Sequence, residues 1–385
     1  MSGERKAQGR QAEAVNNASP REAQGRQPEA SKEGRSHEET IFSACPAPIL
    51  DHKTVVLGHG SGGKLTHQLL QKMILPAFRN PSLDAQHDGA VLSMSGGRIA
   101  FSADSYVVHP IFFPGGTIGD LAVNGTVNDL SMCGARPQYL SASFIIEEGL
   151  PMADLWRILC SMKEAADAAG ISLVTGDTKV IDRGKGDKIF VNTSGIGVIS
   201  EGVNIDPARA RPGDVVIVNG PIASHGMAIM SVREGLEFES PIESDTAPLN
   251  GLVEAILNAS HAVHVLRDPT RGGVASALNE IAEKSRAGIL IRESSLPIRS
   301  EVQGACEILG LDPLYVANEG KLLAFVHRQE ADKILSAMRS HNLGKDSTII
   351  GEVVEDHPGI VVMTTRIGGS RVVDMLSGEQ LPRIC

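Results

Sequence analysis

The sequence predicts a mixed α/β protein of two domains followed by a short tail. From residue 54 onward, apolar runs bounded by glycines alternate with helical patterns, as in proteins that pack helices on sheets. The 385 residues are 42% hydrophobic but only 3% aromatic, so small aliphatic side chains must fill the cores. Proline, glycine and charge interrupt the pattern at 206–214, just before the apolar run 215–218, which indicates a domain boundary.

Residues 1–48 differ from everything that follows them. Gln, Glu, Arg, Ser and Gly dominate there, with almost no Val, Ile or Leu, so little apolar surface can offset the entropy cost of ordering. The eight residues from Ala7 also recur in slightly altered form from Ala23. We expect a disordered extension and assign it no function.

The expected elements alternate along both domains. Ser95, Gly96 and Gly97 separate the apolar runs 91–94 and 98–101, which predicts a hairpin and hence an antiparallel component in the N-terminal domain. The pattern further predicts helices near 65–75, 117–133 and 152–169, the last ended by Gly170, and strands near 171–175 and 189–199. We expect the domains to span 49–210 and 211–376, and the tail to span 377–385.

Composition excludes several classes of protein. A net charge of -10 argues against non-specific nucleic-acid binding, which depends on lysines and arginines. No apolar stretch approaches the roughly 18 residues of a membrane span, and the N-terminus is polar, so we expect a cytoplasmic protein. The five cysteines are odd in number, scattered and free of any C-x-x-C pair, which predicts free thiols rather than disulfides or a zinc site.

A glycine-rich stretch at 58–64 partly matches two phosphate loops. Gly58, Gly60 and Gly63 fit a dinucleotide pattern, but the predicted hairpin that follows is not the parallel unit which that pattern needs. Gly63 and Lys64 fit a Walker pattern, but Leu65 occupies the place of its Ser or Thr. Exposed backbone N–H groups beside a lysine could still bind an anion. The alternative is a plain flexible turn.

Four aspartates sit at or beside apolar runs: Asp88, Asp104, Asp129 and Asp268. Each one alone is more typical of a helix cap or a turn. Four together suit magnesium with a triphosphate, since this ion prefers oxygen ligands and carboxylates. Asp120, Asn124 and Asn128 add a polar stripe at helical spacing, which is either a solvated face or, as we favour, one wall of a cleft.

Three further places carry reactive groups. Asp177, Thr178 and Lys179 follow a predicted strand, where sites of α/β proteins commonly gather. Glu319 precedes an apolar run and could act as a base in a partly dry cleft, or do nothing at a solvated turn. Cys385 ends a segment that looks too short and polar to pack, so its thiol is either a covalent carrier or an unselected residue.

Taken together, these motifs resemble the HypE family, the carbamoyl dehydratases of nickel-iron hydrogenase maturation. The matching stretches are 58–64, 104–110, 112–116, 127–135, 176–180, 267–273, 318–320 and 382–385. The resemblance runs from about Thr54 to the last residue, and only the N-terminal extension departs from it. The family belongs to a wider ATP-using group with aminoimidazole ribonucleotide (AIR) synthetase and selenophosphate synthetase.

The resemblance implies a two-domain AIR synthetase-like (PurM-like) fold. The N-terminal domain would hold a largely antiparallel or mixed sheet and would pair in a homodimer, followed by a C-terminal α/β domain and a flexible tail. Cys385 would receive a carbamoyl group from the carbamoyltransferase HypF, and the tail would then enter the chain's own ATP site. Dehydration would leave a thiocyanate, whose cyano group passes to iron held by HypC and HypD.

The resemblance also assigns roles residue by residue. Metal and phosphate binding would fall to Asp88, Asp104, Asp129 and Asp268, with Mg²⁺ and ATP as cofactors. The nucleotide would be held by Gly62, Gly63, Lys64, Asn128, Asp177 and Thr178. Catalysis would fall to Cys385, Lys179 and Glu319, with Glu319 as the base. The alternatives are a related synthetase that acts on a diffusible amide or carbonyl compound, and a non-catalytic scaffold for maturation partners.

Overall fold

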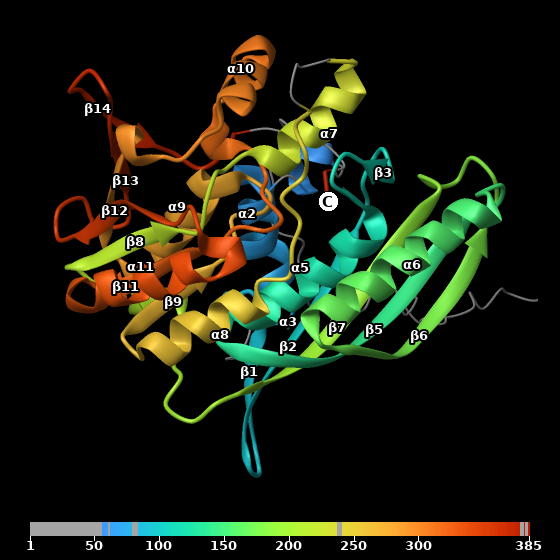
Figure 1. Cartoon of the computed structure of the whole chain (residues 1–385), viewed down its shortest axis with the longest axis horizontal. Helices are drawn as coiled ribbons and strands as arrows, with labels where there is room; N and C mark the ends of the chain where they lie inside the picture. Colours follow the sequence, from blue (N-terminus) through green and yellow to red (C-terminus); the bar gives the residue numbers. More distant parts are fainter. Residues whose placement is uncertain (1–55, 61, 79–83, 237–240, 378–380, 382–383) are drawn as a thin grey trace, which may run out of the picture. The chain divides into compact units, whose positions relative to one another are not determined.

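Two mixed β-sheets organise the chain (Figure 1). The computed structural model describes residues 56–60, 62–78, 84–236, 241–377, 381 and 384–385. The expected disordered extension and Cys45 lie outside these residues. Both sheets belong to one compact unit.

The first sheet has five strands in the order β1-β2-β7-β5-β6. All its pairings are antiparallel except that of β5 with β6. Its strands are β1 (Ala90–Met94), β2 (Gly97–Tyr106), β5 (Ala135–Glu147), β6 (Ser172–Ile181) and β7 (Ile189–Ile199). A small pair, β3 (Phe112–Phe113) and β4 (Gly116–Thr117), forms a separate two-stranded sheet. The predicted hairpin is confirmed as β1–β2, with Met94 opposite Gly97.

Helices α5 (Ile118–Met132) and α6 (Met152–Ala169) lie against this sheet (Figure 1). Both predicted helices are confirmed within one residue. Thr117 caps α5 by accepting from the N–H groups of Gly119 and Asp120, while the Asp120 side chain accepts from the Thr117 N–H in return. Gly170 ends α6 at φ 66°, a left-handed conformation that glycine adopts at low cost. The small side chains of α5 let it pack closely on its neighbours.

A helical segment precedes the first sheet. It consists of η1 (Leu57–Gly60), α2 (Lys64–Leu69), the π-helical η2 (Leu70–Ile74) and α3 (Leu75–Phe78). The predicted helix at 65–75 is therefore confirmed, with a π-helical stretch in its middle.

The second sheet has seven strands in the order β14-β13-β10-β12-β8-β11-β9, and only β10 and β13 pair in parallel. Its strands are β8 (Asp214–Val218), β9 (Val263–Arg267), β10 (Gly288–Arg292), β11 (Leu323–His327), β12 (Thr348–Val354), β13 (Val361–Thr364) and β14 (Ser370–Val373). Every residue of β8 is buried, which explains its unbroken apolar run.

Helices cover both faces of the second sheet. Side chains of α8 and α11 pack on one face, and those of α7, α9 and α10 pack on the other. These helices are α7 (Ser224–Glu234), α8 (Asn250–Ala259), α9 (Gly273–Ser285), α10 (Ser300–Leu309) and α11 (Ala331–Ser340), and short helices lie at η3 (Pro207–Arg209), η4 (Glu293–Ser295), η5 (Pro313–Tyr315), η6 (Arg328–Glu330) and η7 (Asn342–Gly344). Within the described residues, no helix is both long and apolar enough to cross a bilayer.

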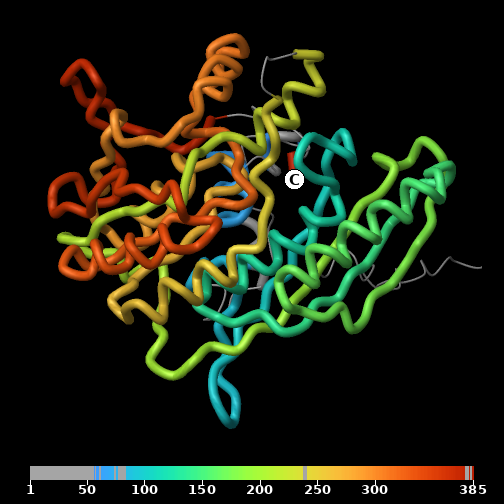
Figure 2. Tube along the Cα trace, in the orientation of Figure 1, coloured from blue at the N-terminus to red at the C-terminus, as the bar shows by residue number. Residues whose placement is uncertain are grey.

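A crossing segment, residues 241–249, precedes α8 and runs between the two sheets beside α5 (Figure 2). The apolar core under α5 and α6 continues onto the α8 and α11 face of the second sheet and includes Ile384 and Cys385. The two halves thus meet along α5, and polar groups at that junction are shielded from water.

Candidate functional site

A cavity of about 1100 Å³ lies where the two sheets meet. Its wall comes from both halves, because it includes the ends of β1 and β2, one side of α5, and the loop after β9. Six of its lining residues are Asp88, Asp104, Asp129, Asp268, Glu319 and Cys385. All six were predicted as site residues, from positions as far apart in sequence as 88 and 385.

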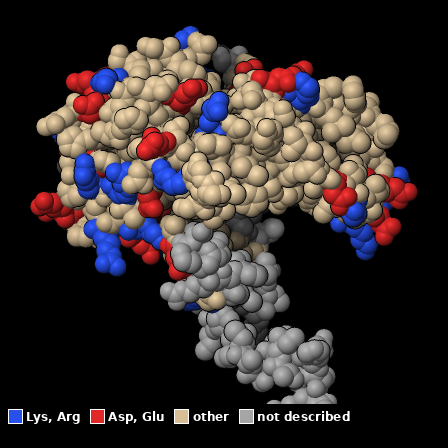
Figure 3. Space-filling view, turned by 90° about the horizontal axis from the view of Figure 1, so that it is seen from below, with Lys and Arg blue, Asp and Glu red and all other residues tan. Residues whose placement is uncertain are grey.

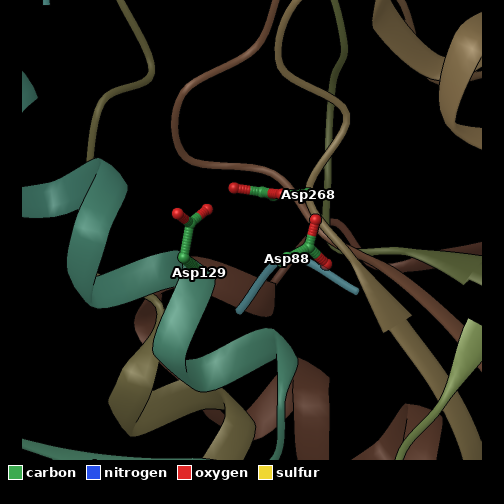
Figure 4. A group of neighbouring side chains, drawn as sticks. All are labelled: Asp88, Asp129 and Asp268. Carbon is green, nitrogen blue, oxygen red and sulfur yellow. The ribbon is translucent and has the colours of Figure 1, made fainter. Parts of the chain in front are cut away.

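Three carboxylates form a cluster in this cavity (Figure 4). Asp88, Asp129 and Asp268 each place an oxygen within 4.8 Å of the others. They come from the segment before β1, from α5 and from the loop after β9, and their carboxylates are turned towards one shared space. Such a group of oxygen ligands suits a hard divalent cation.

Burial makes this cluster electrostatically costly without a cation. Loss of solvent raises the pKa of Asp88 to about 6, although the Arg267 guanidinium beside it opposes the shift. Burial and the neighbouring Asp88 raise the pKa of Asp268 to about 8. Burial and Asp268 also raise the pKa of Asp129, despite a hydrogen bond of 2.6 Å donated by Ser102. One oxygen of Asp88 is buried and has no hydrogen-bond partner among the described residues. The three residues therefore fit a bound cation.

Asp104, the fourth predicted metal ligand, lines the same cavity but stands outside the cluster. Its carboxylate lies 3.7 Å from a guanidinium nitrogen of Arg271. Since Arg271 also lines the cavity, this pair brings a positive charge towards any anion bound there.

Glu319 and Cys385 lie next to each other, with 3% and 8% of their surface exposed. Burial, then Asp268 and Asp245, raise the pKa of Glu319, which makes its carboxylate a stronger base than usual. Burial, then the Glu319 carboxyl group, raise the pKa of the Cys385 thiol, which stays protonated in this position. The expectation that the end of the tail is too polar to pack is wrong for Ile384 and Cys385, because partners from distant parts of the chain enclose them.

Several contacts hold Glu319 in place. Its backbone N–H donates to Asp245 Oδ1 at 3.0 Å, and Lys321 Nζ lies 3.4 Å from the other Asp245 oxygen. The preceding Asn318 is fully buried, and its side chain accepts from the Ala223 N–H at 2.7 Å. One carboxylate oxygen of Glu319 is buried without a hydrogen-bond partner among the described residues. This arrangement leaves it free for a ligand.

The polar stripe of α5 does not line an open cleft as expected. Asn128 donates to the carbonyls of Ala247 and Glu319 and accepts from the Leu249 N–H. Asn124 donates to Thr246, and the Asp120 side chain belongs to the cap of α5. The crossing segment covers the stripe, so any effect of Asn128 on a nucleotide would act through that segment.

The described residues of the glycine-rich loop, 58–60 and 62–64, lie outside the cavity lining. Lys64 Nζ forms an ion pair with Asp374, and the Lys64 N–H donates to the Leu376 carbonyl at 2.7 Å. Gly62 has a φ of 74°, and a Cβ there would meet the Arg271 backbone at 2.6 Å, so glycine is required. The loop thus reaches the backbone of a residue whose side chain lines the cavity.

Asp177, Thr178 and Lys179 are not brought to the cavity either. They lie inside the edge strand β6, not after a strand, because β6 continues past the predicted end at 175 to Ile181. All three are exposed, and Lys179 Nζ lies 2.7 Å from Asp177 Oδ2.

Sequence reasoning missed four residues of the site's framework: Arg267, Arg271, Asp245 and His225. Arg267 and Arg271 flank Asp268 in a stretch already singled out, and a search for cations beside the predicted ligands would have found them. Asp245 and His225 carry no local signal, since their roles arise only from tertiary contacts.

Comparison with protein families places two profiles on the chain. The AIR synthase related protein N-terminal domain matches residues 86–199, and the AIR synthase related protein C-terminal domain matches residues 211–363. The first range covers the first sheet with its two helices, and the second begins just before β8.

The chain is also similar to individual proteins and to solved structures over most of its length. Carbamoyl dehydratase HypE of Cupriavidus necator is 53% identical over 330 residues, which cover 86% of this chain and 94% of that protein. A crystal structure of a HypE-HypF complex matches 80% of this chain and 99% of its own at 51% identity and a TM-score of 0.76. A crystal structure of HypE in complex with ATP matches 86% of this chain and 100% of its own at 49% identity and a TM-score of 0.73.

Proposed function

The chain belongs to the HypE family of carbamoyl dehydratases, and we propose that its substrate is a carbamoyl group carried on its own Cys385. The chain is an ATP-dependent dehydratase of hydrogenase maturation. One observation supports a self-carried substrate. The Cys385 thiol lies against Glu319, and both residues line the same cavity as the three clustered aspartates. A thiol in that place can present a thiocarboxamide to a bound nucleotide.

The protonation of Cys385 supports a division of the reaction into two places. The thiolate is the nucleophilic form of cysteine, and the buried position keeps the thiol protonated by raising its pKa. Loading of the carbamoyl group would therefore take place with Cys385 outside the cavity, on a partner carbamoyltransferase of the HypF type. The buried position suits the loaded group, which is neutral.

Dehydration would then proceed through phosphorylation of the carboxamide oxygen. The carboxamide oxygen attacks the γ-phosphorus of ATP, and ADP leaves. Glu319 takes one N–H proton, the C–O bond breaks with release of phosphate, and the departing phosphate takes the second N–H proton as the C≡N bond forms on sulfur. A buried base of raised pKa is suited to this proton transfer, which typically contributes about 10²–10⁴ in rate. Arg271 offers a fixed positive charge beside the reacting group.

We propose Mg²⁺ as the cation of the aspartate cluster. Asp88, Asp129 and Asp268 would hold it, and the Asp88 oxygen that has no hydrogen-bond partner among the residues described supports this assignment. Bound there, the ion would offset the negative charge of the nucleotide phosphates. We further propose that Gly62, Gly63 and Lys64 close on those phosphates, because the exposed pair of Lys64 with Asp374 is weak and readily exchanged.

We propose a homodimer that pairs through the outer face of the first sheet. Phe101, Ile196 and Tyr139 lie opposite one another on β2, β7 and β5, and their side chains are 43%, 41% and 51% exposed. Val198 and Ile145 extend this apolar face. On the side of the molecule that carries the first sheet, a broad surface shows few charged side chains (Figure 3). An apolar patch of this extent is typical of an interface.

Such a dimer would also explain the position of Lys179. Its strand β6 is at the sheet edge and exposed almost throughout, so Lys179 does not line the cavity of its own chain. We propose that Lys179 serves the cavity of the second copy, where Asp177 and Thr178 would accompany it.

Two further assignments follow from the family. We propose that the cyano group passes to an iron carrier of the HypC–HypD type. We also propose a cytoplasmic location, which the free thiols of Cys133, Cys160, Cys306 and Cys385 support, since such thiols persist in reducing compartments.

The test is mass spectrometry of the tail peptide after incubation with HypF, its carbamoyl donor and Mg-ATP. The expected product is a thiocyanate on Cys385, absent in Cys385→Ala and retained in the matched control Cys160→Ala. A nitrile or phosphorylated product that survives Cys385→Ala would favour the synthetase with a diffusible substrate. ATP hydrolysis that is undiminished in Asp129→Asn would contradict the proposed phosphate site.

A further inference from the structure

The residue before Cys385 is held by a buried histidine. His225 Nε2 lies 2.8 Å from the backbone carbonyl oxygen of Ile384, and His225 has no exposed surface. Ile384 is itself only 3% exposed. His225 occupies the first turn of α7 and does not line the cavity. It therefore contacts the tail without contacting the space where a nucleotide would bind.

The hydrogen bonds around His225 fix its tautomer. A carbonyl oxygen can only accept, so Nε2 must carry the proton that is donated to Ile384. Nδ1 is then an acceptor, and Ser244 Oγ lies 2.8 Å from it as the donor. The Ser244 hydroxyl oxygen in turn accepts from the Thr246 N–H at 3.2 Å. Burial lowers the pKa of His225, which keeps the ring neutral as this chain of donors requires.

The ring is also fixed sterically and through the crossing segment. Phe113 packs edge-on against it, with ring centroids 5.6 Å apart. The Ser244 N–H donates to the Pro114 carbonyl at 2.8 Å, and Thr246 accepts from Asn124 of α5. The crossing segment that orients His225 through Ser244 also holds the Glu319 N–H through Asp245. One segment thus positions both the group that grips the tail and the group that lies against its thiol.

We propose that His225, Ser244 and the Ile384 carbonyl form a tail clasp, which positions Cys385 at Glu319 and sets how readily the tail leaves the cavity. His225 is a positioning residue, since it acts one residue away from the sulfur. The role of the clasp in dehydration rests on the proposed function. The existence of the clasp does not depend on that function.

The clasp is tested by alkylation of the full-length protein with N-ethylmaleimide, without nucleotide or carbamoyl donor, read peptide by peptide. His225→Phe keeps a ring against Phe113 but removes the donor. We expect Cys385 to react about ten-fold faster, the factor for loss of one buried hydrogen bond. Cys133 and Cys306, both buried elsewhere, serve as internal controls and should keep their wild-type rates.

Two further variants separate the hydrogen bond from packing. His225→Gln retains an N–H donor near the position of Nε2 and should restore protection of Cys385. Ser244→Ala removes the group that fixes the tautomer and should raise the rate less than His225→Phe. An unchanged Cys385 rate in His225→Phe would overturn the proposal. A parallel rise at Cys133 and Cys306 would do so too, because it would show general loosening of the fold.

A second measurement connects the clasp with catalysis. On protein already carbamoylated at Cys385, His225→Phe should slow dehydration while the Kd for ATP stays at its wild-type value. Normal dehydration with fast alkylation would overturn the positioning role. If wild-type protein forms no thiocyanate at all while the alkylation pattern holds, the proposed function fails and the clasp stands.

Discussion

Glu319 and Lys179 were both predicted as catalytic residues, yet they lie in contrasting regions of the molecule. Glu319 is 3% exposed in a loop between the two halves, held through Asn318 and Asp245 and turned towards Cys385. Lys179 is exposed on the edge strand β6, and within the described part of the chain its ionic partner is Asp177. The surroundings of Glu319 are formed entirely within one chain, whereas the Lys179 side chain points to the surface.

The contrast has a physical basis. A buried carboxylate needs fixed neighbours, because an unpaired buried charge is costly, and those neighbours determine its pKa. An exposed lysine on an edge strand needs none, and its ion pair with Asp177 contributes little in water. The cavity of one chain therefore holds the buried Glu319 and the aspartate cluster, whereas Lys179 lies outside that cavity.

The largest expected effect is that of Glu319→Gln. Gln cannot accept the N–H proton, so the chain should still be carbamoylated on Cys385 but should form thiocyanate about 10²–10⁴-fold more slowly. The measurement is the ratio of thiocarboxamide to thiocyanate in the tail peptide over time. Glu283→Gln is the matched control, since Glu283 lines the cavity but its side chain is 64% exposed. Thiocyanate formation at the normal rate would remove Glu319 from the mechanism.

The next effect tests whether Lys179 works in a second copy. Lys179→Ala and Cys385→Ala should each be inactive alone, the first because phosphate charge is left less neutralised. Refolded or co-expressed together, random pairing should place an intact Lys179 beside an intact Cys385 in about a quarter of the sites, as expected for a symmetric dimer. Thiocyanate yield of the mixture, relative to wild type, is the measurement.

If the mixed variants formed no thiocyanate, the assignment of Lys179 to the partner's cavity would be contradicted. Val174→Ala, on the same exposed strand, should keep the wild-type thiocyanate yield and controls for general changes on β6. Recovery that persists when Tyr139→Asp disrupts the apolar face would show that pairing uses another surface.

Much of the fold could be predicted because its signals are local. Thr117 with Asp120, Gly170 and the apolar run of β8 mark helix ends and a buried strand by their own chemistry. The end of β6 was missed because Gly176 and Asp177 look like a turn, whereas parallel pairing with β5, Asp177 opposite Ser143, keeps them extended. Tertiary pairing outweighed local propensity there.

The site was predictable as a set of residues but not as an arrangement. Asp88, Asp129 and Asp268 were found from their motifs, and the structure brings them together. Neither the separation of Asp104 from that cluster nor the burial of Cys385 follows from the sequence pattern, because both depend on Arg271, His225 and Glu319, which lie far away in the chain.

A third prediction compares how a buried and an exposed aspartate affect the pH dependence of stability. In metal-free protein the pKa of Asp268 is raised from its usual value to about 8, so the folded state binds a proton that the unfolded state has released. Stability should therefore fall as pH rises from about 4 to about 8. Asp268→Asn should flatten this slope and raise the Tm at pH 8 by roughly 2–4 °C, the shift for about 1 kcal/mol.

Asp177→Asn provides the matched control for this stability change. The Lys179 ammonium lowers the pKa of Asp177, so its charge does not change between pH 5 and 8, and the slope should stay as in wild type. Added Mg²⁺ should stabilise wild type and Asp177→Asn but not Asp268→Asn. An apo Tm that rises with pH across this range would contradict the buried charge cluster.

The smallest expected effect concerns Asp245, whose negative charge raises the pKa of Glu319. Asp245 contributes to the raised pKa of Glu319, and Glu319 must be ionised to act as a base. Asp245→Asn keeps an acceptor for the Glu319 N–H but removes the charge, so the acidic limb of the dehydration rate should move to lower pH, by roughly one unit or less. The limb is measured on carbamoylated protein at saturating ATP, with Asp167→Asn as the exposed control outside the cavity lining. A shift to higher pH, or the same shift in the control, would mean that the cavity does not couple its charges as its burial requires.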